Sequence, residues 1–467
     1  MRKLVFFFPW REVSGGPFYL ARLANAVARE NLYEVYYTDY QSGLCDSILE
    51  EKSIKVLKYK DGEIHFEIFP EEPVILVMAE YWAHVMPKVH PKTKIIFFNW
   101  HNECVPVLQR DWCATDAFIE KFLSLVNRTS SVFFCDKTHW LSHKRGNIEV
   151  EERYVPIIIP ARNQIALSKL VRKNERNIAV LGRLCRDKIY AVLDLMDNIV
   201  GLRDRVKTTV YIIGEGDHEE LLFFRKFPEH IRVIRCGTMD IKAVVSLLIR
   251  KVDILFAMGT SVLEGATIRL PSVVIPNAMD PFECNRYPYL FESKGYSLGW
   301  YPEQIDDLNM TTHTVEEIFC DIYQKGLKAQ IGEQCYEYYT KNHMQNIDQF
   351  LQAINASTLT HEIFQEFVKK NINWKRTAWI IKHQLKKWYG QPYKGLSFLG
   401  FPIYRHTKTD DTHSNIYLCG IPLLRIHRTP AANSIYPLPL IWGWRLIQHF
   451  CSFFIYQIKG KQEETKK

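Results

Sequence analysis

Short apolar runs alternate with helical patterns along most of the chain, and this alternation is what most constrains its fold. Over about the first 160 residues the strand-like runs are KLVFFF, EVYYTD, VILVMAEY, KIIFFNW and SVFFC, with helical stretches such as PFYLARLANAVARE between them. A second series runs from NIAVLGRL through TTVYIIGEG, IRVIRCG and VDILFAMG to PSVVIP. Such alternation is typical of parallel sheets with crossover helices. The sequence therefore predicts an α/β fold of two doubly wound, Rossmann-like domains that face a cleft.

The chain is too long for one compact core, because it has 467 residues. The proline-flanked stretch VPIIIPARNQ is expected to close the first domain. The expected boundaries are an N-terminal domain over 1–165, a C-terminal domain over 166–335, a crossover helix over 336–356 and a helical and hairpin extension over 357–467.

The extension carries the basic charge of the protein. Residues 357–467 contain 17 Lys or Arg against 6 Asp or Glu, a net charge of +11, whereas residues 1–356 have a net charge of −3. The extension also holds 18 aromatic residues, among them Trp374, Trp379 and Trp388. Cationic and aromatic side chains together favour an anionic membrane surface as partner. The alternative is an appendage that packs on the body or mediates oligomers. No nucleic-acid-binding motif is recognisable, so nucleic acid is not expected as a partner.

Two features of the extension bear on its fold. The segments LSFLGFPIYRH (396–406) and IYLCGIPLLRIH (416–427) resemble each other and are both broken at Gly-x-Pro, which predicts a small hairpin-like appendage. Residues 435–458 approach the length of a membrane span, but prolines, a glycine, an arginine and a histidine interrupt them. This pattern favours an interfacial segment over a span.

The cysteines and the start of the chain indicate a cellular compartment. The 11 cysteines are scattered and odd in number, and no Cys-x-x-Cys or Cys/His spacing indicates zinc. So many unpaired thiols are typical of a reducing, cytosolic environment. The opening MRKLVFFFPW is interpreted as a first strand, because its apolar run is too short for a signal peptide. We expect a cytoplasmic protein, peripheral on the inner face of the membrane.

A pair of cations follows the first strand of the second series. In LGRLCRDK, Arg183 and Lys188 lie five residues apart beside Gly182. A guanidinium binds two phosphate oxygens at once, and an ammonium adds a mobile point charge, so the pair suits a diphosphate. For the cation pair alone, a solvated loop is the commoner explanation.

Glycines end the next two strands. Gly214 and Gly216 would let backbone approach a ligand, and the turn at Gly237 could hold a planar base. The third glycine of a dinucleotide-binding fingerprint is missing, so that interpretation is weak. A simple tight turn is the competing explanation.

The fourth strand end combines a glycine, two hydroxyls and a carboxylate. A helix that begins near Val262 would present free N–H groups, and such a helix start binds phosphate. Glu264 is placed to accept hydrogen bonds from two ribose hydroxyls, although a carboxylate there can simply complement the helix dipole. The backbone groups expected at the phosphate are those of Gly259, Thr260, Ser261 and Val262.

In order and spacing, these motifs resemble the retaining glycosyltransferases of family 4, which have the GT-B fold. The family's Gly-Gly loop is matched by Gly15 and Gly16 in SGGP. Its Gly-Arg-x4-Lys motif is matched at Arg183 and Lys188, and its Glu-Ala-x-Ala-x-Gly-x-Pro-Val segment is matched in register from Glu264. The resemblance covers roughly residues 1–356.

The resemblance implies an activity and roles for these residues. The chain would transfer a sugar from a nucleotide-diphosphate donor to a saccharide acceptor, lipid-linked, in the synthesis of bacterial surface glycans such as lipopolysaccharide or capsule. Arg183 and Lys188 would neutralise the departing nucleoside diphosphate, Glu264 would hold the ribose, and Gly16 would let its loop approach the phosphates. Such enzymes need no bound metal and no cofactor.

The sequence departs from the family in one place. The family usually has two glutamates eight residues apart, but the position eight before Glu264 is Phe256, and the turn is shortened. The first glutamate of the family often contacts the donor sugar, and Thr260 and Ser261 are the candidate substitutes for it here. A catalytically silent scaffold of a polysaccharide assembly complex and a nucleotide-sugar epimerase are the alternative functions.

The first domain offers candidates for the acceptor side. The family often has a histidine near the sugar and acceptor, and His101 follows the strand KIIFFN, although a histidine there is more often structural. Glu80 is a weaker candidate. Trp82 and Trp100 could stack on a sugar ring, although an aromatic at a strand end usually packs in the core.

Overall fold

The structure is a computed structural model, and it divides into two compact units, Met1–Asn371 and Ile372–Lys467. The residues that it describes are 1–10, 15–43, 45–61, 63, 65–101, 104–111, 114–143, 150–162, 174–344, 347–371, 394–398, 401–408, 413–418, 421–428 and 433–437.

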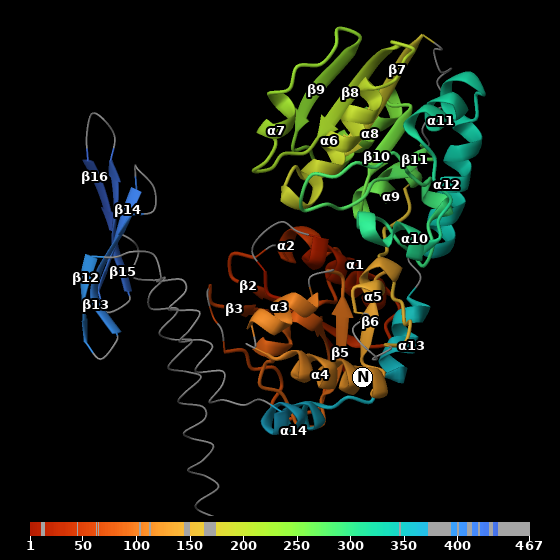
Figure 1. The fold of residues 1–467 in the computed structure, drawn as a ribbon. Helices are drawn as coiled ribbons and strands as arrows, with labels where there is room; N and C mark the ends of the chain where they lie inside the picture. The colour runs from red at the N-terminus through yellow and green to blue at the C-terminus, as the bar shows by residue number, and fades with distance from the viewer. Residues whose placement is uncertain are drawn as a thin grey trace, which may run out of the picture. The chain divides into compact units, whose positions relative to one another are not determined.

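A six-stranded parallel sheet forms the first part of the larger unit (Figure 1), and the hydrogen-bonded pairs give the strand order β3-β2-β1-β4-β5-β6. Its central strands are buried on both faces and consist mostly of Val, Ile, Leu and Phe, as parallel strands covered by helices require. The strands are β1 (Lys3–Phe7), β2 (Glu34–Tyr40), β3 (Lys55–Tyr59), β4 (Ile75–Ala79), β5 (Lys94–Asn99) and β6 (Val132–Phe134). The helices are α1 (Gly15–Arg29), α2 (Cys45–Ile48), η1 (Glu80–Val85), α3 (Cys104–Asp111), α4 (Asp116–Arg128) and α5 (Lys137–Leu141).

A five-stranded parallel sheet follows, with the order β11-β10-β7-β8-β9. The prediction of two doubly wound parallel sheets is thus confirmed. The strands are β7 (Glu175–Leu181), β8 (Lys207–Ile213), β9 (Ile231–Gly237), β10 (Ile254–Ala257) and β11 (Ser272–Val274). The helices up to the end of the sheet are α6 (Arg186–Val200), α7 (Glu220–Phe223), α8 (Ile241–Lys251) and α9 (Thr260–Ala266).

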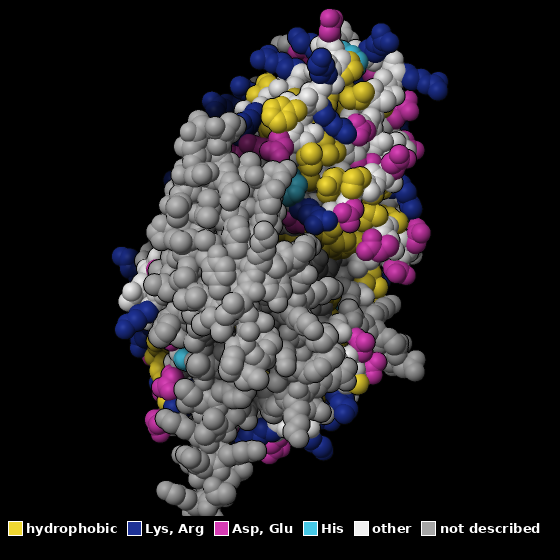
Figure 2. Space-filling view, turned by 60° about the vertical axis from the view of Figure 1, so that its left-hand side comes forward, with side chains coloured by type: hydrophobic (Ala, Val, Ile, Leu, Met, Phe, Trp, Pro, Cys, Tyr) yellow, Lys and Arg dark blue, Asp and Glu magenta, His cyan; other side chains and the backbone are white. Residues whose placement is uncertain are grey.

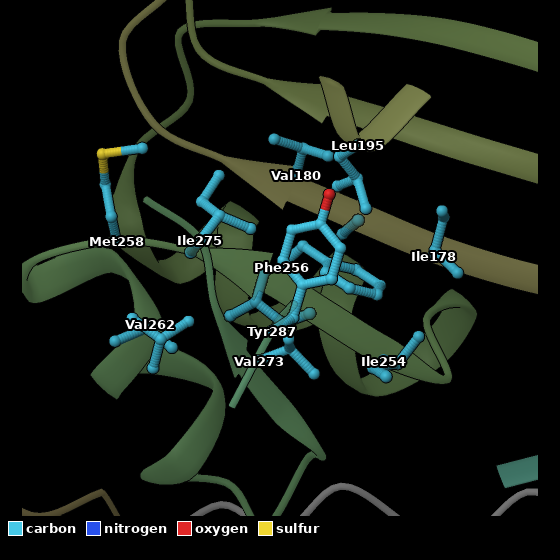
Figure 3. Close-up of a cluster of buried hydrophobic side chains, with 14 of the residues drawn as sticks. Ile178, Val180, Leu195, Ile254, Phe256, Met258, Val262, Val273, Ile275 and Tyr287 are labelled. Atoms are coloured by element: carbon cyan, nitrogen blue, oxygen red, sulfur yellow. The ribbon is translucent and has the colours of Figure 1, made fainter. Parts of the chain in front are cut away.

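The core of this second sheet explains the phenylalanine at the departure from the family pattern. Phe256 lies inside β10 with no exposed surface, and its ring meets that of Tyr287 edge-on at 6.2 Å (Figure 3). Ile178 and Val180 of β7 and Ile275 beyond β11 belong to the same apolar cluster. The side chain at position 256 therefore packs in the core of the second sheet.

After the second sheet the chain forms short helical elements and then returns to the first sheet. Phe350 of α13 is fully buried in the first core, and its ring lies 5.8 Å from that of Phe6 and 5.9 Å from that of Phe98. Leu359 continues this return, because its carbonyl accepts a hydrogen bond from the N–H of Ile95. The remaining elements of this unit are η2 (Leu290–Glu292), η3 (Pro302–Gln304), α10 (Ile305–Leu308), α11 (Val315–Phe319), the π-helix η4 (Cys320–Gln324), α12 (Lys328–Asn342), α13 (Asp348–Ala356) and α14 (His361–Asn371).

The smaller unit contains an antiparallel sheet with the sequential order β12-β13-β14-β15-β16. The two Gly-x-Pro segments each form a hairpin, and each has a register shift at the same place, where Pro402 pairs with Ser397 and Pro422 pairs with Tyr417. Proline has no N–H to donate to the ladder, so a bulge there is expected. The strands are β12 (Lys394–Phe398), β13 (Phe401–Lys408), β14 (His413–Leu418), β15 (Ile421–Arg428) and β16 (Asn433–Pro437).

Within the described part of the chain, no helix is long and apolar enough to cross a membrane. The predicted interfacial segment 435–458 lies outside the described residues after Pro437, as do Trp374, Trp379 and Trp388. On the face that Figure 2 shows, Lys and Arg side chains of the described residues are interspersed with Asp and Glu.

Candidate functional site

The strand order of the second sheet defines where a ligand would bind. From β7 the chain builds β8 and β9 on one side and then β10 and β11 on the other, so the order reverses between β7 and β10. Ligands of doubly wound sheets bind outside the carboxyl ends of the strands at such a reversal. Leu181 of β7 pairs with Ala257 of β10, so the turns that begin at Gly182 and Met258 are neighbours.

The two predicted cations lie at this point. Arg183 is exposed in the turn after β7, and Lys188 lies in the first turn of α6. Burial, and then the hydrogen bond to Asp187, raises the pKa of the Cys185 thiol to about 11, whereas the charges of Lys188 and Arg183 act in the opposite direction. Both cations therefore lie near one thiol. Among the described residues neither has an ion-pair partner, so both charges are available to a ligand.

The glycines of β8 and β9 hold the turns together. The N–H of Gly182 donates to Ile213 O at 3.0 Å, and the N–H of Gly214 donates to Gly237 O at 2.9 Å. A Cβ on Gly214 would lie 2.1 Å from Gly182 O, and one on Gly216 would lie 2.4 Å from the backbone of Leu184. Gly214 also has a φ of 129° and Gly237 a φ of 69°. The close approach at Gly214 and Gly216 is thus an approach of backbone to backbone, which fixes three turns as one rigid edge.

The turn before α9 is open at Gly259. This residue has a φ of 60°, and a Cβ added there would meet nothing within 4 Å. Of the four predicted N–H groups, that of Gly259 donates to Leu298 O at 2.6 Å, and that of Val262 donates to Gly259 O at 3.3 Å. In the region that the structure describes, the N–H groups of Thr260 and Ser261 donate to no backbone or side-chain acceptor. These two remain available to a phosphate.

Glu264 is buried, and its carboxylate already has charged partners. Arg162, in the linker between the sheets, donates to Oε2 from Nε at 3.1 Å and from Nη2 at 2.5 Å. The Nη2 of Arg22 on α1 lies 3.8 Å from Oε1. The structure thus places Glu264 where the first half of the chain meets the second. Sequence reasoning missed both arginines, because no local pattern links residues so far apart.

The first sheet has a matching reversal between β1 and β4, where aromatic residues gather. A Cβ on Gly16 would lie 3.0 Å from Trp100 Nε1, so this glycine lets α1 begin against the indole, while Gly15 has nothing within 4 Å of its Cβ position. The rings of Trp10 and Trp82 lie 6.1 Å apart. We call Phe8, Trp10, Tyr81, Trp82 and Trp100 the aromatic cluster, whose rings are linked pairwise at 4.8–6.1 Å.

His101 is exposed next to this cluster, 6.3 Å from the ring of Tyr81, and its N–H donates to Asn99 Oδ1 at 3.3 Å. Glu80 is not on the surface. It is fully buried, its Oε2 lies 2.7 Å from His143 Nε2, and the side chain of Asn99 donates to the same oxygen at 2.9 Å. Glu80 therefore has no access to an acceptor, and the buried His143 is a further residue that sequence reasoning missed.

A cluster of metal-ligand side chains lies at the end of β6. Cys135, Asp136 and His139 have ligand atoms within 4.8 Å of one another. Asp136 caps α5 by accepting from the N–H of His139 at 2.9 Å, and the two side chains also meet at 2.5 Å. Burial, and then the charge of Asp136, raises the pKa of Cys135 far above its usual range. The helix cap accounts for the contact between Asp136 and His139.

One loop connects the edges of the two sheets. The N–H of Lys137 on α5 donates to Gly295 O, and the hydroxyl of Thr138 donates to Gly299 O, both at 2.8 Å. The carbonyl of the preceding residue, Leu298, accepts a hydrogen bond from the N–H of Gly259. The loop 295–299 therefore joins α5 to the start of α9.

The fold is that of two Rossmann-like α/β domains in one unit, the architecture of GT-B proteins. No family profile matches the sequence, and no curated protein matches it. Similar solved structures include the apo form of WaaB, a lipopolysaccharide outer core galactosyltransferase, which is 13% identical with a TM-score of 0.46 over 76% of this chain and 99% of that one. A trehalose-6-phosphate synthase, OtsA, is 11% identical with a TM-score of 0.47 over 77% and 100%. A glycosyltransferase from Rickettsia africae ESF-5 is 14% identical with a TM-score of 0.42 over 79% and 99%.

Proposed function

We propose that the protein is a glycosyltransferase, which transfers a sugar from a nucleoside-diphosphate donor to a saccharide acceptor. The observation that carries the proposal is the pair Arg183 and Lys188, two cations without ion-pair partners among the described residues, at the strand-order reversal of the second sheet. In the neighbouring turn, at the start of α9, the N–H groups of Thr260 and Ser261 have no acceptor among the described residues. Such a set of fixed donors suits a pyrophosphate.

In the reaction, the bond between the anomeric carbon and the diphosphate breaks, the oxygen of an acceptor hydroxyl bonds to that carbon, and the hydroxyl proton leaves with the diphosphate. Negative charge grows on the diphosphate as it leaves, so Arg183 and Lys188 bind the transition state more strongly than the ground state. Because these cations supply the charge, the transfer needs no metal or other cofactor. EDTA in the assay should leave the rate unchanged, and a rate that depends on added Mg²⁺ or Mn²⁺ would contradict this.

The finer assignments rest on the sequence motifs. We infer a retaining transfer, as in glycosyltransferase family 4, with a lipid-linked saccharide acceptor in the synthesis of a bacterial surface glycan. His101 would lie beside the transferred sugar, next to the aromatic cluster. The configuration of the product's anomeric proton, measured by NMR, tests the retaining assignment directly.

A ligand panel tests the function itself. UDP-, GDP- and ADP-sugars are offered to the full chain, and one nucleotide series should raise the melting temperature, because a ligand that binds the folded state stabilises it. Slow donor hydrolysis should accompany binding. Binding without any turnover would instead identify a silent scaffold, and conversion of the donor to an epimer without acceptor would identify an epimerase. No shift with any of the donors would contradict the proposal.

The location of the enzyme is a separate proposal. We infer that residues 357–467, with their net charge of +11, bind an anionic membrane surface at the cytoplasmic side. The full chain should sediment with vesicles of anionic phospholipid and not with vesicles of phosphatidylcholine, and salt should release it. Equal binding to both kinds of vesicle would contradict the charge argument.

A further inference from the structure

Three charged side chains from distant parts of the chain meet where the two halves of the larger unit touch. Arg22 lies on α1, Arg162 lies in the linker that follows the first sheet, and Glu264 lies on α9. The side chain of Glu264 is only 6% exposed, whereas those of the arginines are 24% and 22% exposed. Burial of a carboxylate is costly unless partners compensate it, so this arrangement calls for a reason.

The two oxygens of the Glu264 carboxylate have different partners. Oε2 accepts both hydrogen bonds from Arg162, whereas Oε1 has only Arg22 Nη2 at 3.8 Å, which is beyond hydrogen-bonding distance. Within the described residues, nothing donates a hydrogen bond to Oε1. A carboxylate oxygen can accept two hydrogen bonds, so Oε1 keeps its full capacity for a ligand.

The arginines also outnumber the carboxylate. Burial lowers the pKa of Arg22, and repulsion by Arg162 adds to this, while Glu264 acts in the opposite direction. The Nη1 atom of Arg22 is buried and has no hydrogen-bond partner. Arg22 therefore attracts the carboxylate by its charge without donating a hydrogen bond to it, whereas Arg162 alone fixes the orientation of the carboxylate.

We propose that Arg162 is a positioning residue of the donor site, which holds Glu264 by Oε2 so that Oε1 accepts a hydrogen bond from a ribose hydroxyl of the nucleoside diphosphate. This inference rests on the proposed function. A glutamate fixed before the ligand arrives loses no rotamer freedom when it binds, so its hydrogen bond contributes more to affinity. Because Arg162 lies in the linker between the two sheets, the recognition of ribose would depend on the position of that linker.

The competing explanation is that the ion pair only joins the two halves. The two explanations differ in one readout. A pair that only joins the halves would affect stability and would leave the preference for ribose hydroxyls unchanged. A positioning residue controls that preference.

The experiment measures this preference by calorimetry on the full chain. UDP, GDP and ADP are titrated, and the one that binds the wild type is compared with its 2′,3′-dideoxy counterpart, which lacks both ribose hydroxyls. The wild type should prefer the ribonucleotide by about 10- to 100-fold, as expected for a hydrogen bond to a charged group. Arg162→Gln should weaken ribonucleotide binding by about tenfold, leave dideoxynucleotide binding nearly unchanged, and so reduce the preference.

Two further variants complete the test. Arg162→Lys keeps the charge and one donor, so it should restore part of the preference. Arg29 lies on the same helix as Arg22 and forms ion pairs with Glu50 and Glu51. Arg29→Ala removes these ion pairs, and this control variant should retain the full preference for the ribonucleotide. Should Arg162→Gln fail to fold, Arg162→Lys still decides, because a fixed orientation requires the two donors of arginine.

The outcomes separate this inference from the proposed function. If none of the three nucleotides binds the wild type, the proposed function fails and the inference falls with it. If one binds and Arg162→Gln or Arg162→Lys shows the full wild-type preference, the inference alone is overturned. A wild type that binds both nucleotides equally also overturns it.

Discussion

The carboxyl-end edges of the two parallel sheets have the same topology but carry different kinds of side chain. Each sheet has one reversal of strand order, between β1 and β4 in the first and between β7 and β10 in the second. At the first reversal lie Trp10, Trp82 and Trp100, and at the second lie glycines with Arg183 and Lys188. An aromatic surface favours a sugar ring, and a cationic one favours phosphate. Under the proposed function, the acceptor would bind at the first edge and the donor at the second.

The largest expected effect comes from the cations of the second edge. Arg183→Ala and Lys188→Ala should each lower sugar transfer by about 100- to 1,000-fold, because each removes a group that stabilises the leaving diphosphate. Initial rates with the donor found in the ligand panel provide the measurement.

Arg186→Ala is the matched control for this experiment. It removes a cation from α6, the helix that carries Lys188. Arg186 pairs with Asp280, but the two side chains are 62% and 77% exposed, so the pair contributes little. Its rate should stay within about twofold of the wild type. Wild-type rates for Arg183→Ala, with an intact melting transition, would break the assignment of this edge.

The glycines of the second edge should differ sharply in their tolerance of a side chain. Gly214→Ala should destabilise the protein by about 3 kcal/mol, because its Cβ would lie 2.1 Å from Gly182 O. Gly259→Ala meets no atom within 4 Å and should lose only the backbone strain, about 1–2 kcal/mol, of a φ of 60° with a ψ of −143°. Urea unfolding compares them, and equal losses would show that the turns are not packed as described.

The junction of the two halves should be sensitive to acid. Burial lowers the pKa of His343 to about 4, its Nδ1 lies 2.8 Å from Ile157 O, and its Nε2 is buried without a partner. The folded state therefore binds this proton less readily than the unfolded state, whose histidine has a pKa of 6.5. Stability is retained above pH 6.5 and falls as the pH drops toward 4, by about 2 kcal/mol at pH 5.

Melting temperatures between pH 4.5 and 7.5 measure this effect. The variant His343→Gln, which keeps a donor for Ile157 O and does not titrate, should show a shallower fall than the wild type. Identical pH profiles for the two proteins would contradict the assignment of the acid sensitivity to His343.

The smallest effect is expected at the first edge. Trp82→Ala removes a ring that packs at 4.8 Å from Phe8 and at 6.1 Å from Trp10. The KM for the saccharide acceptor should rise about tenfold, by roughly 1.4 kcal/mol, while the Kd of the nucleotide stays unchanged. If Trp82→Ala weakened nucleotide binding instead, the assignment of the acceptor to the first edge and the nucleotide to the second would be contradicted.

The parts of the fold that repeat a local pattern could be predicted from the sequence. Ten of the strands in the two parallel sheets coincide with the apolar runs, and helix α9 begins at Thr260, close to the expected Val262. Strand β3 was missed. It lies at the edge of its sheet, where Lys55 and Lys58 are exposed and no second buried face requires apolar residues.

The candidate site could be predicted only in part. Arg183 and Lys188 lie at a strand end, and the chain order of strands fixes that location. The partners of Glu264 could not be predicted, because Arg162 is separated from it by 102 residues and their meeting depends on how the two halves pack. The role of Gly214 could not be predicted either, because the atom that excludes a side chain there, Gly182 O, belongs to another turn.

The return of α13 and α14 to the first sheet has a consequence for synthesis and for engineering. The faces of Phe6 and Phe98 are covered by Phe350, which leaves the ribosome after the whole second domain. The first domain thus remains unfinished while its neighbour folds, against the usual order in which N-terminal domains fold first. A fragment that ends at the linker would expose this apolar face, so the two halves can be separated only if residues 347–371 are supplied to the first.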